Sequence, residues 1–261
     1  MAFPELRLGF IGTGTITEAI VTGIVSGAEP APEIFVSPRS AKTAAHLAAL
    51  SPQVTVAADN QHVVDVADML FLAVRPDVAV DVVRALRFRP NQKVVSLIAT
   101  VDHETLRALI DVPVNLVRAV PLPFVATRSG VTTIFPPDPA VEAFFSRLGT
   151  AVACATIEEF DILAVASALM GSYFGIMDHI VGWMQSKGLP QESARRYLAQ
   201  HFLSLSTVAF RNPSTSLADL RREYSTKGGL NEHMFAEYRD SGGLDALSHG
   251  LDAVLARIQT R

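Results

Sequence analysis

Cysteine is nearly absent from this chain, since Cys154 is the only one among 261 residues. A single thiol excludes a disulfide within the chain and a cysteine-rich zinc site, and it suits a reducing compartment. The sequence also has no histidine pair at metal-ligand spacing and no paired carboxylates near histidines, so we expect no metal site.

An excess of basic residues is missing too: 22 Lys and Arg face 26 Asp and Glu, for a formal net charge of −4. This balance gives no electrostatic footprint for nucleic acid or an anionic membrane. Residues 1–5 lack the basic and apolar regions of a signal peptide. The most lipid-like stretch, residues 162–177, is short for a membrane span. We therefore expect a cytoplasmic protein in which residues 162–177 form a buried core helix.

Short apolar runs alternate with helical patterns as far as residue 154, as expected for a doubly wound, mainly parallel sheet. Strands are predicted at residues 6–11, 34–36, 54–56, 69–74, 93–98, 114–119, 130–135 and 150–154. Helices are predicted at residues 41–50, 59–67, 77–86, 102–110 and 139–148, with Asp59 or Asn60 capping the second and Asp102 the fourth.

Strand signals stop near residue 157. The remaining patterns predict helices at residues 158–186, 191–210, 217–223, 231–241 and 244–259. We therefore expect a Rossmann domain over residues 1–155, followed by an all-helical domain over residues 156–261.

The first strand ends in a glycine turn, Gly12-Thr13-Gly14, and a helical pattern follows it. In a dinucleotide-binding fold, the first glycine permits the tight turn and the second lets the backbone approach a pyrophosphate at the helix N-terminus. Thr17 stands where the third glycine of the fingerprint is expected. The predicted pyrophosphate site consists of Gly12, Thr13, Gly14, Thr15 and Ile16.

The second strand is followed by Ser37, Arg39 and Ser40. An NAD enzyme usually has an acidic residue here for the ribose 2′-hydroxyl, whereas two hydroxyls and a guanidinium suit a 2′-phosphate. The prediction is an NADP(H) cofactor. The alternative is an ordinary glycine turn followed by a solvated arginine.

Six segments together resemble pyrroline-5-carboxylate reductases, in that family's order and over nearly the whole chain. They are residues 9–14, 36–40, 72–76, 118–121 with 130–132, 168–172 and 225–229. The N-terminal part also resembles NADP oxidoreductases of the F420-dependent type. The resemblance implies an NADPH-dependent reductase of a small cyclic imine or related C=N or C=O compound, a role in proline metabolism, and a homodimer or a multiple of dimers. It also implies cofactor contacts from Ala73, Val74, Arg75 and Pro76 beside the nicotinamide ribose and from Ala99 and Thr100 beside the ring.

The chain departs from the family at three places. Pro121-Leu122-Pro123-Phe124 replaces Pro-Asn-Thr-Pro, and residues 170–175 replace Ser-Gly-Ser-Gly-Pro-Ala. Lys227-Gly228-Gly229-Leu230-Asn231 replaces a Pro-Gly-Gly-x-Thr turn that places a hydroxyl against the imine nitrogen. An asparagine amide donates a hydrogen bond but releases no proton, which the product nitrogen must gain. We therefore expect a rebuilt substrate pocket and weak or absent activity on pyrroline-5-carboxylate.

The candidate catalytic residues are Ser225, Thr226 and Asn231, and the candidate substrate contacts are Pro121, Leu122, Ser172, Tyr173, Lys227, Gly228 and Gly229. Structural roles stay open for several of them: turn and capping groups, a core tyrosine and an exposed lysine. His179 and His233 lie on predicted helices, where a lone histidine more often has a structural role.

There are three alternatives to this reductase. β-Hydroxyacid dehydrogenases share the architecture but use a lysine early in the helical domain, and no lysine lies between Lys93 and Lys187. An F420-dependent NADP reductase remains open. The third is a non-catalytic NADP-binding sensor, because polar groups of the family are missing.

Overall fold

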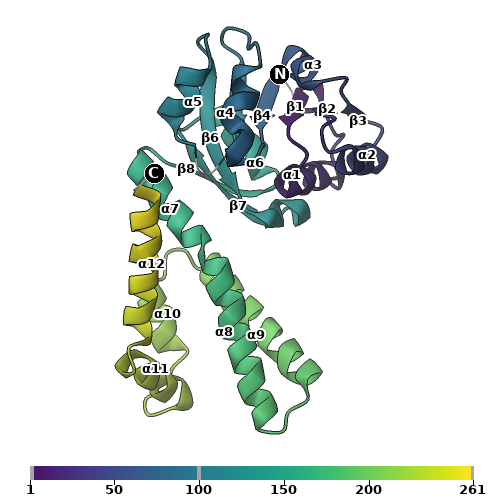
Figure 1. The fold of residues 1–261 in the computed structure, drawn as a ribbon. Coiled ribbons are helices and arrows are strands. Elements are labelled where there is room, and N and C mark those ends of the chain that lie inside the picture. The colour runs from purple at the N-terminus through teal and green to yellow at the C-terminus, as the bar shows by residue number, and fades with distance from the viewer. Residues whose placement is uncertain (1–2, 99–100, 260–261) are drawn as a thin grey trace. The chain divides into compact units, whose positions relative to one another are not determined.

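The computed structural model describes residues 3–98 and 101–259 (Figure 1). It divides into two compact units, residues 1–164 and residues 165–261. Ala99 and Thr100, two of the predicted cofactor contacts, lie outside the described residues.

The first unit contains one eight-stranded sheet in the order β3-β2-β1-β4-β5-β6-β7-β8. Its strands are β1 Arg7–Ile11, β2 Glu33–Val36, β3 Val54–Val56, β4 Met69–Leu72, β5 Lys93–Ser96, β6 Asn115–Pro121, β7 Gly130–Phe135 and β8 Gly149–Ala153. All neighbours pair in parallel except β6 and β7. The connection between those two is short, and a parallel return needs a much longer crossover. The predicted fold class, a mainly parallel Rossmann sheet followed by helices, is confirmed.

Helices cover both faces of the sheet (Figure 1). They are α1 Thr15–Val25, α2 Ala41–Leu50, α3 Asn60–Val66, α4 Pro76–Arg84, α5 His103–Leu109 and α6 Pro139–Ser146, with 3-10 turns η1 Phe3–Glu5 and η2 Pro123–Thr127. Strand residues alternate between the two cores: Phe71 packs toward α1, α2 and α6, while Leu70 and Leu72 pack toward α3, α4 and α5. Burial on both faces accounts for the nearly continuous apolar sequence of β4.

Aromatic rings fill the first of these cores. The rings of Phe10 and Phe71 stack at 4.6 Å, and Phe71 lies 5.0 Å from Phe144. Each fully buried side chain of this size contributes roughly 1.5–3 kcal/mol relative to an exposed one. This core fixes the strand ends at which the glycine turn lies.

The predicted caps of two helices are present. Asp59 accepts a hydrogen bond from the His62 amide and Asp102 accepts one from the Thr105 amide, each at 2.7 Å. Both satisfy an amide in the first turn that has no partner within its own helix.

The second unit is helical throughout its described residues. Its helices are α8 Leu169–Ser186, α9 Gln191–Arg211, α10 Leu217–Glu223, α11 Leu230–Asp240 and α12 Gly243–Gln259, and α7 Ile157–Ser167 links the two units in sequence. Phe160 at the start of α7 is buried and lies 6.1 Å from the ring of Phe135 on β7. The compact sheet unit therefore extends beyond residue 155.

Two expectations for residues 157–186 were wrong. The predicted single helix over residues 158–186 is interrupted at Ala168, whose amide bonds to the Val165 carbonyl three residues earlier. This tighter turn ends the α-helical pattern locally. The expected buried core helix is instead largely exposed within one chain: Ile162, Phe174 and Ile176 are 58%, 60% and 49% exposed. By length and composition alone, residues 157–186 are apolar enough to cross a membrane.

Candidate active site

The glycine turn is built around a close approach of two strand ends. Gly12 follows β1 with φ +102°, and a Cβ added there would lie 2.5 Å from the Ala73 carbonyl oxygen after β4. Positive φ and a backbone clash each exclude a side chain at this position. The prediction of a tight turn at Gly12 is confirmed.

Two side chains hold the Gly12 peptide groups. The Gly12 amide donates to Ser37 Oγ at 2.8 Å, and Thr17 Oγ1 donates to the Gly12 carbonyl at 2.7 Å. Both side chains are buried. Thr17, at the position of the missing third glycine, therefore contributes a hydrogen bond that a glycine would lack.

The space beyond the turn suits a pyrophosphate. Gly14 is the N-cap of α1 without a side-chain cap, and a Cβ added there meets nothing within 4 Å. The first intrahelical bond runs from the Glu18 amide to the Gly14 carbonyl, so the amides of Thr15, Ile16 and Thr17 precede it. Thr13 Oγ1 is buried and has no hydrogen-bond partner within residues 3–98 and 101–259. An open helix N-terminus beside an unsatisfied hydroxyl fits an anionic ligand.

A cavity of about 620 Å³ adjoins the end of β2. Its walls come from three places: the turn after β2, the first turn of α3 and one face of α4. They comprise Pro38, Arg39, Asp59, Asn60, Gln61, Val78, Asp81, Val82, Ala85 and Leu86. This volume lies within the range of small-ligand sites.

The three residues predicted at the 2′-phosphate occupy different environments. Arg39 lines the cavity and is exposed, and Ser40 is an exposed N-cap of α2 whose side chain makes no cap bond. Ser37 is buried, and its oxygen already accepts from Gly12. Asp59 and Asn60 were predicted only as a helix cap, and the α4 wall was not predicted, although parallel strands that end at one edge signal that the residues after β3 lie close to those after β2.

Residues 73–76 follow β4 next to the glycine turn. The Ala73 amide donates to the Ile11 carbonyl at 2.8 Å, which ties the segment to the end of β1. Pro76 is the first residue of α4, and Arg75 pairs with Asp77 at 2.8 Å. The structure thus brings Gly12, Ser37 and Ala73 together at one edge of the sheet. Pro121 and Leu122, at the end of β6, belong to the same unit.

A buried arginine lies on β6, in register with Ser96 of β5. The Arg118 guanidinium lies 4.7 Å above the Phe160 ring. Burial lowers the pKa of Arg118, and Asp161 and Asp102 oppose this shift. Burial also lowers the pKa of His103, helped by Arg107 and Arg118. Arg118 lies in one of the family-like segments, residues 118–121, and no role was predicted for it.

Of the candidate catalytic residues, Ser225 and Thr226 lie in the turn between α10 and α11, and Asn231 is the second residue of α11. Asn231 Nδ2 donates to the Tyr224 carbonyl at 2.6 Å, and the Gly229 amide donates to the Thr226 carbonyl at 2.8 Å. Gly228 has φ +69°, and its amide donates to the Glu232 carboxylate at 2.5 Å. The Asn231 side chain therefore stabilises its own turn, while Lys227 and Leu230 are exposed.

Ser172 and Tyr173 come from a different element, the first turns of α8. The Tyr173 ring lies 5.3 Å from Phe174 and 5.7 Å from Phe202 on α9, and it is partly exposed. Among the residues that the structure describes, no group of three or more metal-ligating side chains gathers.

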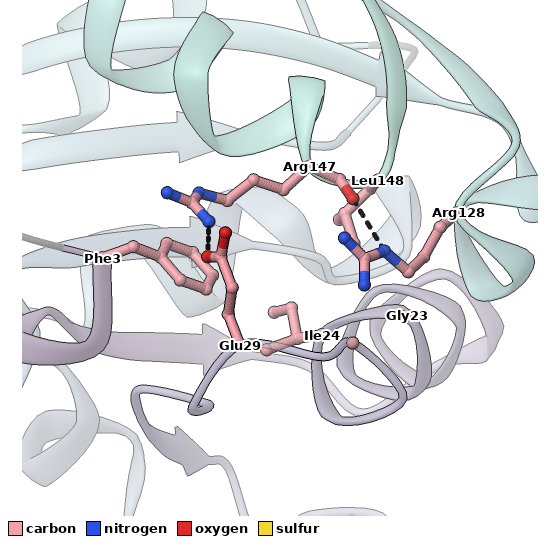
Figure 2. Close-up of a pocket in the computed structure, with 8 residues that line it drawn as sticks. Phe3, Gly23, Ile24, Glu29, Arg128, Arg147 and Leu148 are labelled. Atoms are coloured by element: carbon pink, nitrogen blue, oxygen red, sulfur yellow. Dashed lines mark hydrogen bonds and ion pairs between the residues drawn. The ribbon is translucent and has the colours of Figure 1, made fainter.

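A second, much smaller cavity of about 10 Å³ lies beside the C-terminal end of α1. Figure 2 shows Arg147 reaching Glu29, with the ring of Phe3 beside its guanidinium. Arg128 donates to the Arg147 carbonyl at 3.0 Å. The cavity holds about one water molecule, so these arginines join loops of the sheet unit rather than bind a ligand.

Comparison with known proteins gives matches along most of the chain. Residues 7–100 match the family described as NADP oxidoreductase, coenzyme F420-dependent, and residues 158–261 match the pyrroline-5-carboxylate reductase dimerisation family. A pyrroline-5-carboxylate reductase of Vibrio alginolyticus is 26% identical, over 97% of this chain and 96% of its own length.

Solved structures share the fold. A pyrroline-5-carboxylate reductase from Coxiella burnetii has a TM-score of 0.85 at 22% identity, covering 98% of both chains. The Plasmodium falciparum pyrroline carboxylate reductase, solved with NADP bound, has a TM-score of 0.83 at 16% identity and covers 99% of both chains.

Proposed function

Because this chain belongs to the pyrroline-5-carboxylate reductase family, we propose that it is an NADPH-dependent reductase of the C=N bond in a small cyclic imine. The observation that carries this proposal is the open glycine turn, with the unsatisfied Thr13 hydroxyl beside the α1 N-terminus. A bound nicotinamide supplies the hydride, and the protein contributes binding and orientation. We assign the nucleotide to residues 1–155 and most of the substrate contacts to residues 156–261, with Pro121 and Leu122 as substrate contacts from the first domain.

The choice of NADPH over NADH rests on Arg39 and Ser40. Their exposed side chains lie after β2, where a ribose 2′-phosphate is bound in this fold class. Ser37 positions the glycine turn through its bond to Gly12 and keeps its own hydroxyl proton for donation. Arg39→Ala should cost roughly 1.5–3 kcal/mol of NADPH affinity, the size of a hydrogen bond to a charged group. Equal wild-type affinities for NADPH and NADH would contradict the assignment.

The proposed substrate is a cyclic imine other than pyrroline-5-carboxylate, or a related small carbonyl compound. Asn231 stands at the family's hydroxyl position, and its amide is already bonded to the Tyr224 carbonyl. Reduction adds a hydride to carbon and a proton to nitrogen, so Ser225, Thr226 or a bound water must supply the proton. Lys227 is the proposed partner for a substrate carboxylate, with Ser172, Tyr173, Gly228 and Gly229 as further contacts.

The same bond from Asn231 favours a second candidate, an NADP-binding sensor without catalysis. Oxidation of NADPH in the presence of pyrroline-5-carboxylate and a panel of other cyclic imines separates the two. Turnover of any imine supports the reductase, and NADPH binding without turnover supports the sensor. Asn231→Thr should raise the rate on pyrroline-5-carboxylate; a wild-type rate near the enzyme median of about 10 per second would show that this departure is without effect.

We further propose a cytoplasmic homodimer. The dimerisation-family match covers residues 158–261, and α8 exposes large apolar side chains that one chain leaves uncovered. A large exposed apolar face of this kind marks a protein–protein interface, and the same face of a second subunit can bury it. In this assembly, the turn at residues 225–231 faces the long helix of the partner subunit and completes the substrate site.

A further inference from the structure

The cavity at the end of β2 has a charge pattern that a 2′-phosphate alone does not explain. Arg39 is the one cation among its lining residues, and Asp59 and Asp81 are its anions. The lining therefore has a formal charge of −1 where the proposed function requires a dianion to bind. This inference rests on that proposed function.

The two carboxylates differ in their surroundings. Asp59 caps α3 by accepting from the His62 amide at 2.7 Å, so the helix N-terminus partly compensates its charge. Asp81 lies midway along α4, is exposed, and has no ion-pair partner within residues 3–98 and 101–259. Val78, Val82 and Ala85 form an apolar wall on the same face of α4.

We propose that Asp81 is a specificity-determining residue that limits the preference for NADPH, so that the site also accepts NADH. Asp81 and Arg39 line the same cavity of about 620 Å³, and within a space the size of a small ligand a carboxylate still repels a phosphate dianion through water. The apolar wall suits the flat face of adenine, which both cofactors share. The carboxylate thus weakens NADPH binding selectively, because NADH has no phosphate at this position.

The test measures dissociation constants for NADPH and NADH at low ionic strength, in the full-length wild type and in Asp81→Asn. The variant should bind NADPH about three- to tenfold more tightly, while its NADH affinity changes less than twofold. Raising the salt concentration should shrink the gain, because exposed charges are screened beyond about 8–10 Å. Asp111→Asn is the matched control: it removes an equal charge from the turn after α5, outside the cavity lining, and should change neither constant.

Arg39→Ala keeps the two claims distinguishable. If that substitution leaves the NADPH-to-NADH affinity ratio unchanged, the NADPH assignment itself is overturned. If Arg39→Ala lowers the ratio but Asp81→Asn leaves it fixed, only the role of Asp81 is overturned. Equal weakening of both cofactors by Asp81→Asn also overturns it, since the carboxylate would then bind the shared adenosine.

Discussion

Replacing Gly12 with alanine should destabilise the sheet unit and abolish nucleotide binding. The new Cβ would lie 2.5 Å and 2.8 Å from the Ala73 carbonyl oxygen and carbon, which are backbone atoms held by the end of β4. An L-residue at φ +102° costs roughly 1–3 kcal/mol, and overpacking of this kind adds typically 1–3 kcal/mol. We expect the free energy of unfolding to fall by roughly 2–6 kcal/mol. The fall is measured from the shift of the urea midpoint at fixed protein concentration.

Gly14→Ala provides the matched control. Its Cβ meets no atom within 4 Å, and its backbone has φ −84°, which any residue adopts. The stability should therefore fall by no more than about 1 kcal/mol, the cost of alanine at an N-cap. NADPH affinity should nevertheless fall sharply, because the Cβ occupies the proposed pyrophosphate space. Equal effects of the two substitutions on stability, or unchanged NADPH binding by Gly14→Ala, would refute this account.

Three further results are expected. Thr13→Val removes the unsatisfied buried hydroxyl, so thermal stability should hold or rise while calorimetry shows NADPH affinity lowered by about 0.5–1.5 kcal/mol; unchanged affinity would contradict a ligand role. The Arg7 guanidinium holds the pKa of Asp68 below its ordinary value, so the folded state takes up this proton less readily than the unfolded chain. The stability that the pair contributes is present above pH of about 4 and is lost as pH falls through the folded pKa; Asp68→Asn should therefore flatten the acid limb of the melting-temperature profile, and an unaltered limb would disprove the link. Phe174→Asp should convert a species that sediments at a multiple of 28.1 kDa into a folded monomer without imine reduction, and an active wild-type monomer would exclude the proposed interface.

The sequence predicted the sheet unit well because its signals are local. Apolar runs such as residues 69–72 must be buried on both faces, and capping residues such as Asp59 mark helix starts by their own chemistry. The break at Ala168 carries no such signal. Its neighbours are all compatible with helix, and only the observed bond to Val165 reveals the tighter turn.

The site was predicted less completely because side-chain roles depend on contacts between distant segments. Ser37 fits a phosphate ligand from its place after β2, but the fold turns its oxygen toward the Gly12 amide, 25 residues away. Asp81 had no signal at all, since its importance comes from sharing a cavity with Arg39. Asn231 is a candidate because it stands where the resembling family has a threonine, while its bond to Tyr224 required the structure.

The two hydrogen bonds that join Gly12 to the side chains of Ser37 and Thr17 have a consequence for cofactor engineering. The usual route from NADP to NAD usage installs an acidic residue at the end of the second strand to bind the ribose hydroxyls. At position 37 a carboxylate would be buried, larger than serine, and placed directly against the Gly12 amide of the glycine turn. A redesign library should therefore hold Ser37 and Thr17 constant and vary Arg39, Ser40 and Asp81, where side chains change without loosening the loop.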